Sequence, residues 1–148
     1  MSLIVTPEFG YVLLTVIGMG FHCYIQGFAI GKLRKKLNVL YPDMGDGRHA
    51  DKLTDEQWNL FACTQRAHLN YVEVLPMMIS WTLVGGLKFP MIATGFGLVS
   101  MVGRHLYATG YRSGVAKNRM TGAIIGFLGY FGLLLTSVVS ALKFTELI

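Results

Sequence analysis

Charged residues are scarce in this sequence. Asp, Glu, Lys and Arg make up 14% of its 148 residues, whereas 53% are hydrophobic, and the mean hydropathy is +0.49. Soluble globular domains usually contain about 25% charged residues. The composition therefore argues against a soluble protein and predicts a single membrane domain over residues 1–148 that crosses the bilayer several times.

Cysteine is nearly absent as well. The two cysteines, Cys23 and Cys63, both lie within apolar runs. They provide neither a disulfide framework nor the spacing of a metal-ligand set, so we expect free, packed thiols and no metal site. A cleaved signal peptide is not expected either, because nothing basic precedes Phe9 and the apolar run that follows is too long. The first apolar segment should remain as a membrane anchor.

Acidic residues number 8 against 13 Lys and Arg, which gives a net charge of +5. The basic residues gather between apolar blocks and do not form a stripe with interleaved aromatic residues, so a nucleic-acid partner is a poor interpretation. Anionic lipid headgroups are the better match for this charge. The composition therefore points to a membrane partner.

Long apolar runs are what the sequence has in abundance. Four of them cover about residues 9–30, 60–87, 91–111 and 120–142. At about 1.5 Å per residue, the first run is about 33 Å long as a helix, which suffices for a bilayer core of about 30 Å. The pattern predicts an all-α bundle of four transmembrane helices. In the last run, Gly122 and Gly126 have GxxxG spacing, which predicts a close helix contact.

The connections between the runs differ sharply in Lys and Arg content. Residues 31–58 and 112–119 are rich in both types, whereas the second connection holds only Lys88 and the C-terminal segment only Lys143. The positive-inside rule therefore predicts that the first and third connections are cytoplasmic and that both termini lie on the opposite side. Four of the basic residues are interpreted as interface anchors: Lys35, Lys36, Arg112 and Lys117.

Polar side chains interrupt the second apolar run near its start, in FACTQRAHLNYVE (residues 61–73). Ionisable groups at membrane depth are costly and usually mark function. Arg66, Asn70 and Glu73 follow i, i+4, i+7 spacing, which puts them on one helix face. The third run repeats the pattern at i, i+3, i+7, and the topology puts the two faces at similar depth, where they could meet. The second face consists of Arg104, Tyr107 and Tyr111.

Two interpretations of these polar faces remain open. Arg66 and Glu73 could simply neutralise each other between helices. Against this, Arg34, Arg66, Arg104 and Arg119 outnumber the single carboxylate of Glu73. A surplus of guanidinium groups near a membrane interface favours an anionic ligand.

The same residues resemble a known family. QRAHLNYVE resembles the Arg-Ala-x-x-Asn-x-x-Glu signature of the membrane-associated proteins in eicosanoid and glutathione metabolism, and GRHLY followed by Gly110 and Tyr111 resembles their third-helix signature. Within the family, the runs YVLLT, QRAH, VGG and GRHLYATGY are most similar to the microsomal glutathione transferases of the third type. The resemblance implies a homotrimer that binds glutathione between neighbouring subunits, near the cytoplasmic side.

The resemblance also assigns roles to individual residues. Arg119, in the run RMTG, resembles the arginine that activates the glutathione thiol. His68 stands where relatives often have glutamine. Val74 stands where the leukotriene C4 synthase branch has tyrosine, which makes leukotriene synthesis a weaker expectation. The implied glutathione-binding residues are Arg34, Arg66, His68, Asn70, Glu73, Arg104, Tyr107 and Tyr111.

The implied activity is that of a glutathione transferase and glutathione-dependent peroxidase. The thiolate would attack a lipophilic electrophile or a lipid hydroperoxide that arrives from the bilayer, without a metal. The alternatives are a structural subunit of a membrane complex and a non-enzymatic lipid-binding or scaffold member. The retained polar residues argue against the lipid-binding member: Arg66, Asn70, Glu73 and Arg104. The expected location is the endoplasmic reticulum or the mitochondrial outer membrane.

A few further polar and large apolar residues have more ordinary interpretations. His22 and Gln26, at i, i+4, share a helix face and should form hydrogen bonds between helices. His105 is expected to be packed or at the lipid interface. Three large apolar side chains are interpreted as packing or interface-belt residues: Met77, Met78 and Trp81.

Overall fold

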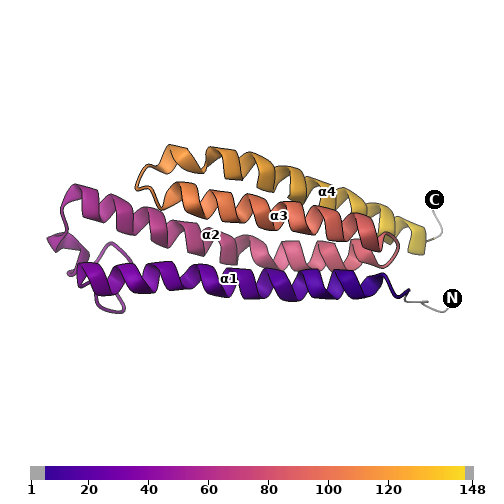
Figure 1. Ribbon diagram of the computed structural model, residues 1–148, viewed down its shortest axis with the longest axis horizontal. Helices are drawn as coiled ribbons and strands as arrows, with labels where there is room; N and C mark the ends of the chain where they lie inside the picture. The colour runs from indigo at the N-terminus through magenta and orange to yellow at the C-terminus, as the bar shows by residue number, and fades with distance from the viewer. Residues whose placement is uncertain (1–5, 146–148) are drawn as a thin grey trace.

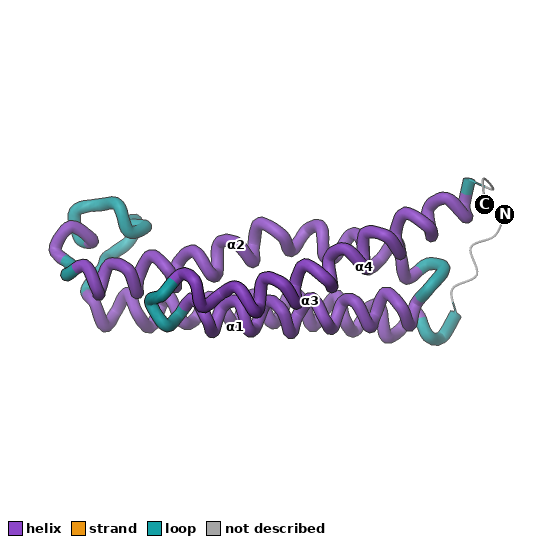
Figure 2. The backbone as a smooth tube through the Cα atoms, turned by 90° about the horizontal axis from the view of Figure 1, so that it is seen from above, coloured by secondary structure: helices purple, strands orange, loops and turns teal. Residues whose placement is uncertain are grey.

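Four long α-helices make up most of the computed structural model, which describes residues 6–145. Two short 3-10 helices lie in the connections, and the described part of the chain contains no strand (Figure 1; Figure 2). The expected all-α fold with four long helices is therefore confirmed. The elements are α1 (Phe9–Leu37), η1 (Ala50–Lys52), α2 (Asp55–Gly86), α3 (Pro90–Tyr111), η2 (Ala116–Arg119) and α4 (Met120–Phe144).

The helices run side by side along the long axis of the molecule (Figure 1). The two basic connections, α1 to α2 and α3 to α4, lie at the same end, and the start of α1 and the end of α4 lie at the other. At the basic end, α1 and α2 extend beyond α3 and α4. The residues at positions 1–5 and 146–148 are outside the described chain.

The end of α1 lies farther along the chain than the apolar run suggested. The helix continues through the basic residues to Leu37, and Asn38 then takes a left-handed conformation with φ of 54°. Lys and Arg are good helix formers and are stabilised near the negative end of the helix dipole. A break at Gly31 was therefore the wrong expectation. The last turn of α1 holds Arg34, Lys35 and Lys36.

The connection between α1 and α2 is organised around Asp43. Its carboxylate accepts hydrogen bonds from the backbone N–H groups of Gly45, Gly47, His49 and Ala50, over 2.8 to 3.1 Å. These donors, with that of Gly45 the strongest influence, lower the pKa of Asp43 to about 2. A short, tightly bonded loop therefore leads into α2.

The start of α2 is a capping box. The Thr54 hydroxyl accepts from the Gln57 backbone N–H at 3.3 Å, and the Gln57 side chain accepts from the Thr54 backbone N–H at 3.2 Å. This reciprocal arrangement satisfies two donors at the helix start. It explains why α2 begins at Asp55, several residues before the apolar run.

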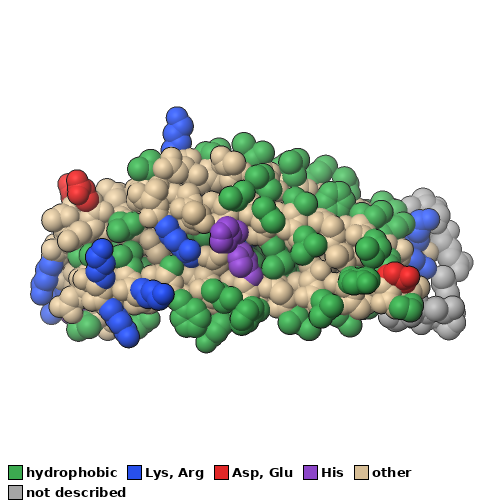
Figure 3. Space-filling model, viewed as in Figure 1, with side chains coloured by type: hydrophobic (Ala, Val, Ile, Leu, Met, Phe, Trp, Pro, Cys, Tyr) green, Lys and Arg blue, Asp and Glu red, His purple; other side chains and the backbone are tan. Residues whose placement is uncertain are grey.

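The outside of the bundle is apolar. Large hydrophobic side chains are spread over the surface (Figure 3). Several side chains with hydroxyl groups are buried inside the bundle. The buried hydroxyls of Thr82, Ser100 and Thr136 each donate to the carbonyl four residues earlier, which satisfies them within the helix. Two segments, Phe9–Leu37 and Ala116–Phe144, are long and apolar enough to cross a membrane. This surface is that of a membrane protein.

Glycine lets α3 and α4 approach closely. A methyl group added at Gly103 would overlap the backbone of Gly126, and one at Gly122 would overlap the backbone of Tyr107. Such contacts between backbones replace side-chain packing where helices meet in lipid. The close contact predicted from the GxxxG spacing is confirmed, and α3 is its partner.

Candidate functional site

The polar faces of α2 and α3 meet in a continuous chain of hydrogen bonds. Arg66 Nη1 lies 3.2 Å from Glu73 Oε1, and Asn70 Nδ2 donates to Glu73 Oε2 at 3.0 Å. From α3, Arg104 Nη1 donates to Asn70 Oδ1 at 2.9 Å. We call Arg66, Asn70, Glu73 and Arg104 the α2–α3 polar face. The side-chain amide of Asn70 joins the two helices.

The outer part of this face is open. The Arg66 and Glu73 side chains are 56% and 50% exposed. Exposed ion pairs usually contribute about 1 kcal/mol or less to stability, because water and salt screen them. Mutual neutralisation is therefore a weak reason for placing these two charges in a membrane protein. Both side chains can reach a ligand without unpacking the bundle.

The inner part is built around Arg104, which is only 4% exposed. Its guanidinium packs 5.0 Å from the ring centre of Tyr71 and 4.5 Å from that of Tyr107, and Nη2 donates to the carbonyl of Ala67 at 3.4 Å. No carboxylate of the described chain pairs with it, and its buried Nε has no acceptor. Neutral groups alone hold this buried cation in place.

Aromatic rings connect Arg104 to Arg119. The rings of Tyr107 and Tyr111 meet edge to face with 5.2 Å between centres, and the Arg119 guanidinium lies 4.8 Å from the centre of Tyr111. Arg119 Nη1 also donates to the carbonyl of Ala116 at 3.0 Å, within η2. Arg119 thus belongs to the same region through ring contacts and makes no hydrogen bond to the polar face.

Two residues expected at the site lie elsewhere in this chain. Arg34 is buried in the last turn of α1, where it donates to the carbonyl of Val39 just beyond the helix and lies 4.3 Å from the ring centre of Tyr41. His68 points at α1, and a methyl group at Gly27 would lie 3.1 Å from its Nε2. Successive helical residues are turned by about 100°, so His68 lies on the opposite side of α2 from its neighbours two positions away.

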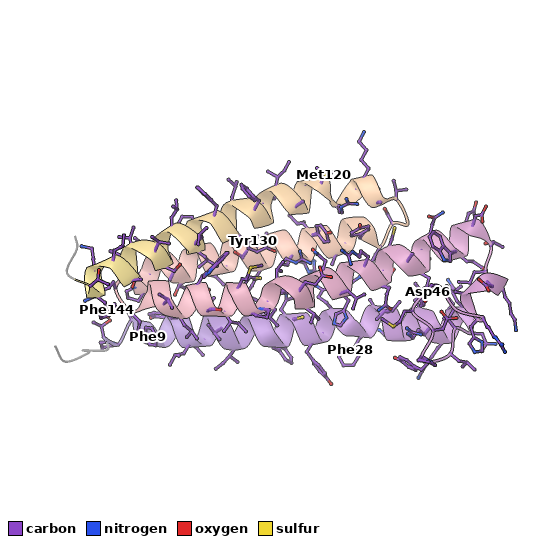
Figure 4. The ribbon with its side chains drawn as sticks, turned by 180° about the vertical axis from the view of Figure 1, so that it is seen from behind. Phe9, Phe28, Asp46, Met120, Tyr130 and Phe144 are labelled. Carbon is purple, nitrogen blue, oxygen red and sulfur yellow. The ribbon has the colours of Figure 1, made fainter. Side chains whose placement is uncertain are left out.

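A cavity between α2 and α4 was not anticipated. It has a volume of about 170 Å³ and an apolar lining. Tyr130, labelled in Figure 4, is one of its lining residues, and the Tyr130 hydroxyl is buried without a hydrogen-bond partner. Met77, Met78 and Trp81, interpreted from the sequence as packing or belt residues, line the cavity. The pair Phe127 and Phe131, at i, i+4 on α4, is the feature of the sequence that could have indicated this cavity. The lining consists of Val74, Met77, Met78, Trp81, Phe127, Tyr130, Phe131 and Leu134.

A second polar region lies between α1 and α3. As predicted, His22 and Gln26 form hydrogen bonds between helices: His22 Nδ1 lies 3.0 Å from the Tyr71 hydroxyl on α2. Gln26 faces His105 of α3 and accepts from Arg112, directly after α3. The Arg112 guanidinium thus also reaches inward to α1, and its interpretation as an interface anchor stays a prediction.

Comparison with known proteins places this geometry in a family context. The model of the MAPEG family matches residues 12–139. Microsomal glutathione S-transferase 2 from Homo sapiens is 32% identical over 133 residues, covering 82% of each chain. The Bos taurus protein of the same name is 30% identical over 134 residues, covering 83% of this chain and 84% of its own. A special likeness to the third microsomal type stays a prediction.

Proposed function

Because the chain belongs to the MAPEG family, we propose that it is a membrane glutathione transferase whose α2–α3 polar face binds glutathione. The relatives that are named glutathione S-transferases support this activity. The observation that carries the proposal is the hydrogen-bonded chain of Arg66, Glu73, Asn70 and Arg104, in which the Glu73 carboxylate contacts one guanidinium directly and the other through the amide of Asn70.

The charges of glutathione complement this face. Glutathione has two carboxylates and one ammonium group, so Arg66 and Arg104 suit the first and Glu73 the second. Asn70 can both donate and accept, which suits a peptide group. The hydroxyls of Tyr107 and Tyr111 lie along the same side of α3 and would complete the pocket.

A binding site between subunits would bring in the remaining expected residues. Arg66 and His68 lie on opposite sides of α2, so one ligand can contact both only if it lies between two copies of the chain. Arg34 belongs to the last turn of α1 and would likewise reach such a ligand from a neighbouring copy. We therefore propose a homotrimer, with His68 and Arg34 contributed by the subunit next to the one that supplies Arg66.

Activation of the thiol is assigned to Arg119. A thiol with a pKa of about 8.5 is mostly protonated at neutral pH, and a neighbouring fixed cation lowers that pKa. Each unit of lowering corresponds to about 1.4 kcal/mol. Contact with the ring of Tyr111 holds the Arg119 guanidinium beside the proposed pocket. Arg119 would then stabilise the thiolate while the polar face binds the rest of glutathione.

The second substrate would enter from the lipid. Val74, the residue after Glu73, lines the cavity between α2 and α4, and the whole lining is apolar. With an electrophile, the thiolate forms a carbon–sulfur bond and the displaced electron pair takes up a proton. With a lipid hydroperoxide, two glutathione molecules yield the alcohol, water and glutathione disulfide. We propose that both reactions take place with the basic connections in the cytoplasm, in the endoplasmic reticulum or mitochondrial outer membrane.

The same cavity favours a second candidate function, lipid binding without turnover. Its apolar lining suits a lipid chain whether or not any reaction follows. The two functions differ at the thiol. A transferase forms a glutathione thiolate on binding, whereas a lipid-binding protein retains a fatty acid and leaves added glutathione protonated.

The test is a titration of the detergent-solubilised full chain with glutathione, followed by the ultraviolet absorbance of the thiolate. We expect a saturable signal that Arg66→Ala weakens roughly 10- to 100-fold, because a hydrogen-bonded charge pair contributes about 1.5–3 kcal/mol. Arg48→Ala, which removes an exposed cation from the α1–α2 connection, is the matched control. A wild-type chain that binds no glutathione would refute the proposal.

A further inference from the structure

The second polar region forms a network that the proposed glutathione site does not use. The Arg112 guanidinium donates through Nη2 to both the carbonyl and the side-chain oxygen of Gln26, the first over 3.2 Å. Gln26 Nε2 lies 3.0 Å from His22 Nε2 and 3.4 Å from His105 Nδ1. The other ring nitrogen of His22, Nδ1, lies 3.0 Å from the Tyr71 hydroxyl. We call these five side chains the α1–α3 network.

The network fixes which imidazole nitrogens carry protons. Arg112 can only donate, so the oxygen of Gln26 faces it and the amide nitrogen donates to the two histidines. His22 then carries its proton on Nδ1 and donates it to Tyr71, whose hydroxyl in turn donates to the carbonyl of Met19 at 3.5 Å. His105 accepts on Nδ1, so its proton is on Nε2. The His105 residue is exposed, and no acceptor for its Nε2 proton is found within residues 6–145.

Positive charge remains uncompensated at the outer edge of the network. Within residues 6–145, Arg112 pairs with no carboxylate, and its Nη1 donates to no protein acceptor. Its titratable neighbours include His22 of α1, His68 of α2 and His105 of α3, and Arg104 adds a further cation near His22. Arg112 Nη1 and His105 Nε2 are thus two N–H donors, next to the two ends of the Gln26 amide, for which the described chain provides no acceptor.

The network lies at a boundary between apolar and basic surface. Exposed aromatic residues on α1 end at Phe28, and the basic residues of that helix begin at Lys32. Arg112 directly follows the last residue of α3, while α1 continues for eleven residues past Gln26, or about 16 Å. In Figure 3, histidine side chains lie near the middle of the long axis, and Lys and Arg side chains follow from there toward the basic end. Headgroups are found at this level in a bilayer.

From these observations we propose that the outer edge of the α1–α3 network, Arg112 and His105, binds the phosphate of an anionic phospholipid. A guanidinium and an imidazole N–H together match a phosphate oxygen pair. The acyl chains would lie along the exposed Leu98 and Val102, one to two turns deeper on α3. The site takes a headgroup from the surrounding leaflet and is separate from the α2–α3 polar face.

The experiment is native mass spectrometry of the full chain in detergent at several concentrations of dioleoylphosphatidylglycerol. We expect one lipid to be retained per chain, and Arg112→Gln to weaken retention about tenfold, as for loss of a charge-assisted hydrogen bond. His105→Ala should weaken it about threefold, and it leaves the folding of the bundle intact because the side chain is exposed. Lys35→Gln removes a cation of the same end and should change retention less than twofold in 0.5 M salt, where exposed charges are screened.

Ligand controls separate the possible sources of the phosphate. Inorganic phosphate and glycerol phosphate should not displace the lipid, because they lack acyl chains, and dioleoylphosphatidylcholine should bind at least fivefold more weakly. Equal retention of both lipids, displacement by free phosphate, or no effect of His105→Ala in a folded chain would overturn the proposal. Glutathione titration of the same samples reports on the other site, so failure here is distinguishable from failure of the proposed function.

Discussion

The two polar regions on either side of α3 use an arginine in different ways. On the α2 side, Arg104 is buried and shares one amide, that of Asn70, with the carboxylate of Glu73. On the α1 side, Arg112 is half-buried and also contacts one amide, that of Gln26, but histidines take the place of the carboxylate. An amide side chain therefore joins the helices in both regions. The local charge depends on the second partner of that amide, which is a carboxylate on the α2 side and a pair of histidines on the α1 side.

The difference has a consequence for the ligand that each region suits. A face with both a carboxylate and guanidinium groups suits a zwitterion, which offers an ammonium group as well as carboxylates. A region with a guanidinium and imidazoles but no carboxylate suits a simple anion. The comparison also separates two sources of stability, because the buried Arg104 is part of the packing whereas Arg66 is not.

Removal of Arg104 should have the largest effect, because it breaks the α2 side completely. Arg104→Ala removes a buried guanidinium and leaves the half-buried Asn70 oxygen without its donor, so we expect the free energy of unfolding to fall by about 3 kcal/mol. Glutathione binding should fall more than 100-fold. Thermal unfolding in detergent and glutathione titration measure the two effects. Retention of wild-type glutathione affinity by Arg104→Ala would contradict the assignment of this face.

Removal of Arg119 should sharpen the comparison by separating binding from chemistry. Arg119→Ala is expected to lower kcat by roughly 10- to 100-fold while the Kd of glutathione stays within about twofold, because a lost neighbouring cation raises the thiol pKa by about one to two units. The pH at which half of the bound glutathione absorbs as thiolate should rise accordingly. Lys117→Ala, in the same 3-10 helix, is the control; an unchanged thiolate midpoint in Arg119→Ala argues against its role.

Gln26→Leu should break the α1 side and leave the α2 side intact. It removes the acceptor of Arg112 and the donor to both histidines, so we expect the free energy of unfolding to fall by about 1–2 kcal/mol. Glutathione affinity should remain within twofold of the wild-type value. A large loss of glutathione binding would show that the two regions are not separate.

The smallest effect on glutathione binding is expected at Asp43. Its carboxylate accepts hydrogen bonds from backbone N–H groups, whereas that of Glu73 pairs with a guanidinium. The pKa of Asp43 is lowered to about 2, below the value of about 3.9 in an unfolded chain, so its stabilising contribution is complete above about pH 4 and is lost as the pH falls toward 2. Asp43→Asn should abolish this acid dependence and leave glutathione affinity at pH 7 unchanged. Hydrogen exchange of the α1–α2 connection between pH 2 and 5 is the measurement; an acid dependence that persists in Asp43→Asn would point to another group.

Much of the fold and part of the site could be predicted from local patterns. Apolar runs gave the four helices, and i, i+4, i+7 spacing placed Arg66, Asn70 and Glu73 on one face. Hydropathy alone placed the end of the first helix too early, because Lys35 and Lys36 end an apolar run although lysine is a good helix former. Periodicity describes one helix at a time.

Contacts between elements were beyond that kind of reasoning. Spacing placed His22 and Gln26 on one face, yet the partner Arg112 comes from 86 positions along the chain. Arg34 and His68 were assigned by resemblance, which carries no information about which side of a helix faces which subunit. The cavity between α2 and α4 arises from how two apolar helices fail to fill the space between them, which no single segment encodes.

The glycine contacts between α3 and α4 have a consequence for the order in which the protein assembles. These helices are joined by residues 112–119 and meet backbone to backbone, whereas α1 and α2 are joined by the longer stretch 38–54. Shorter connections cost less entropy to close. We therefore expect α3 and α4 to pair early after insertion and α1 and α2 to dock onto them afterwards. Both polar regions of α3 would then be completed only in the last step of folding.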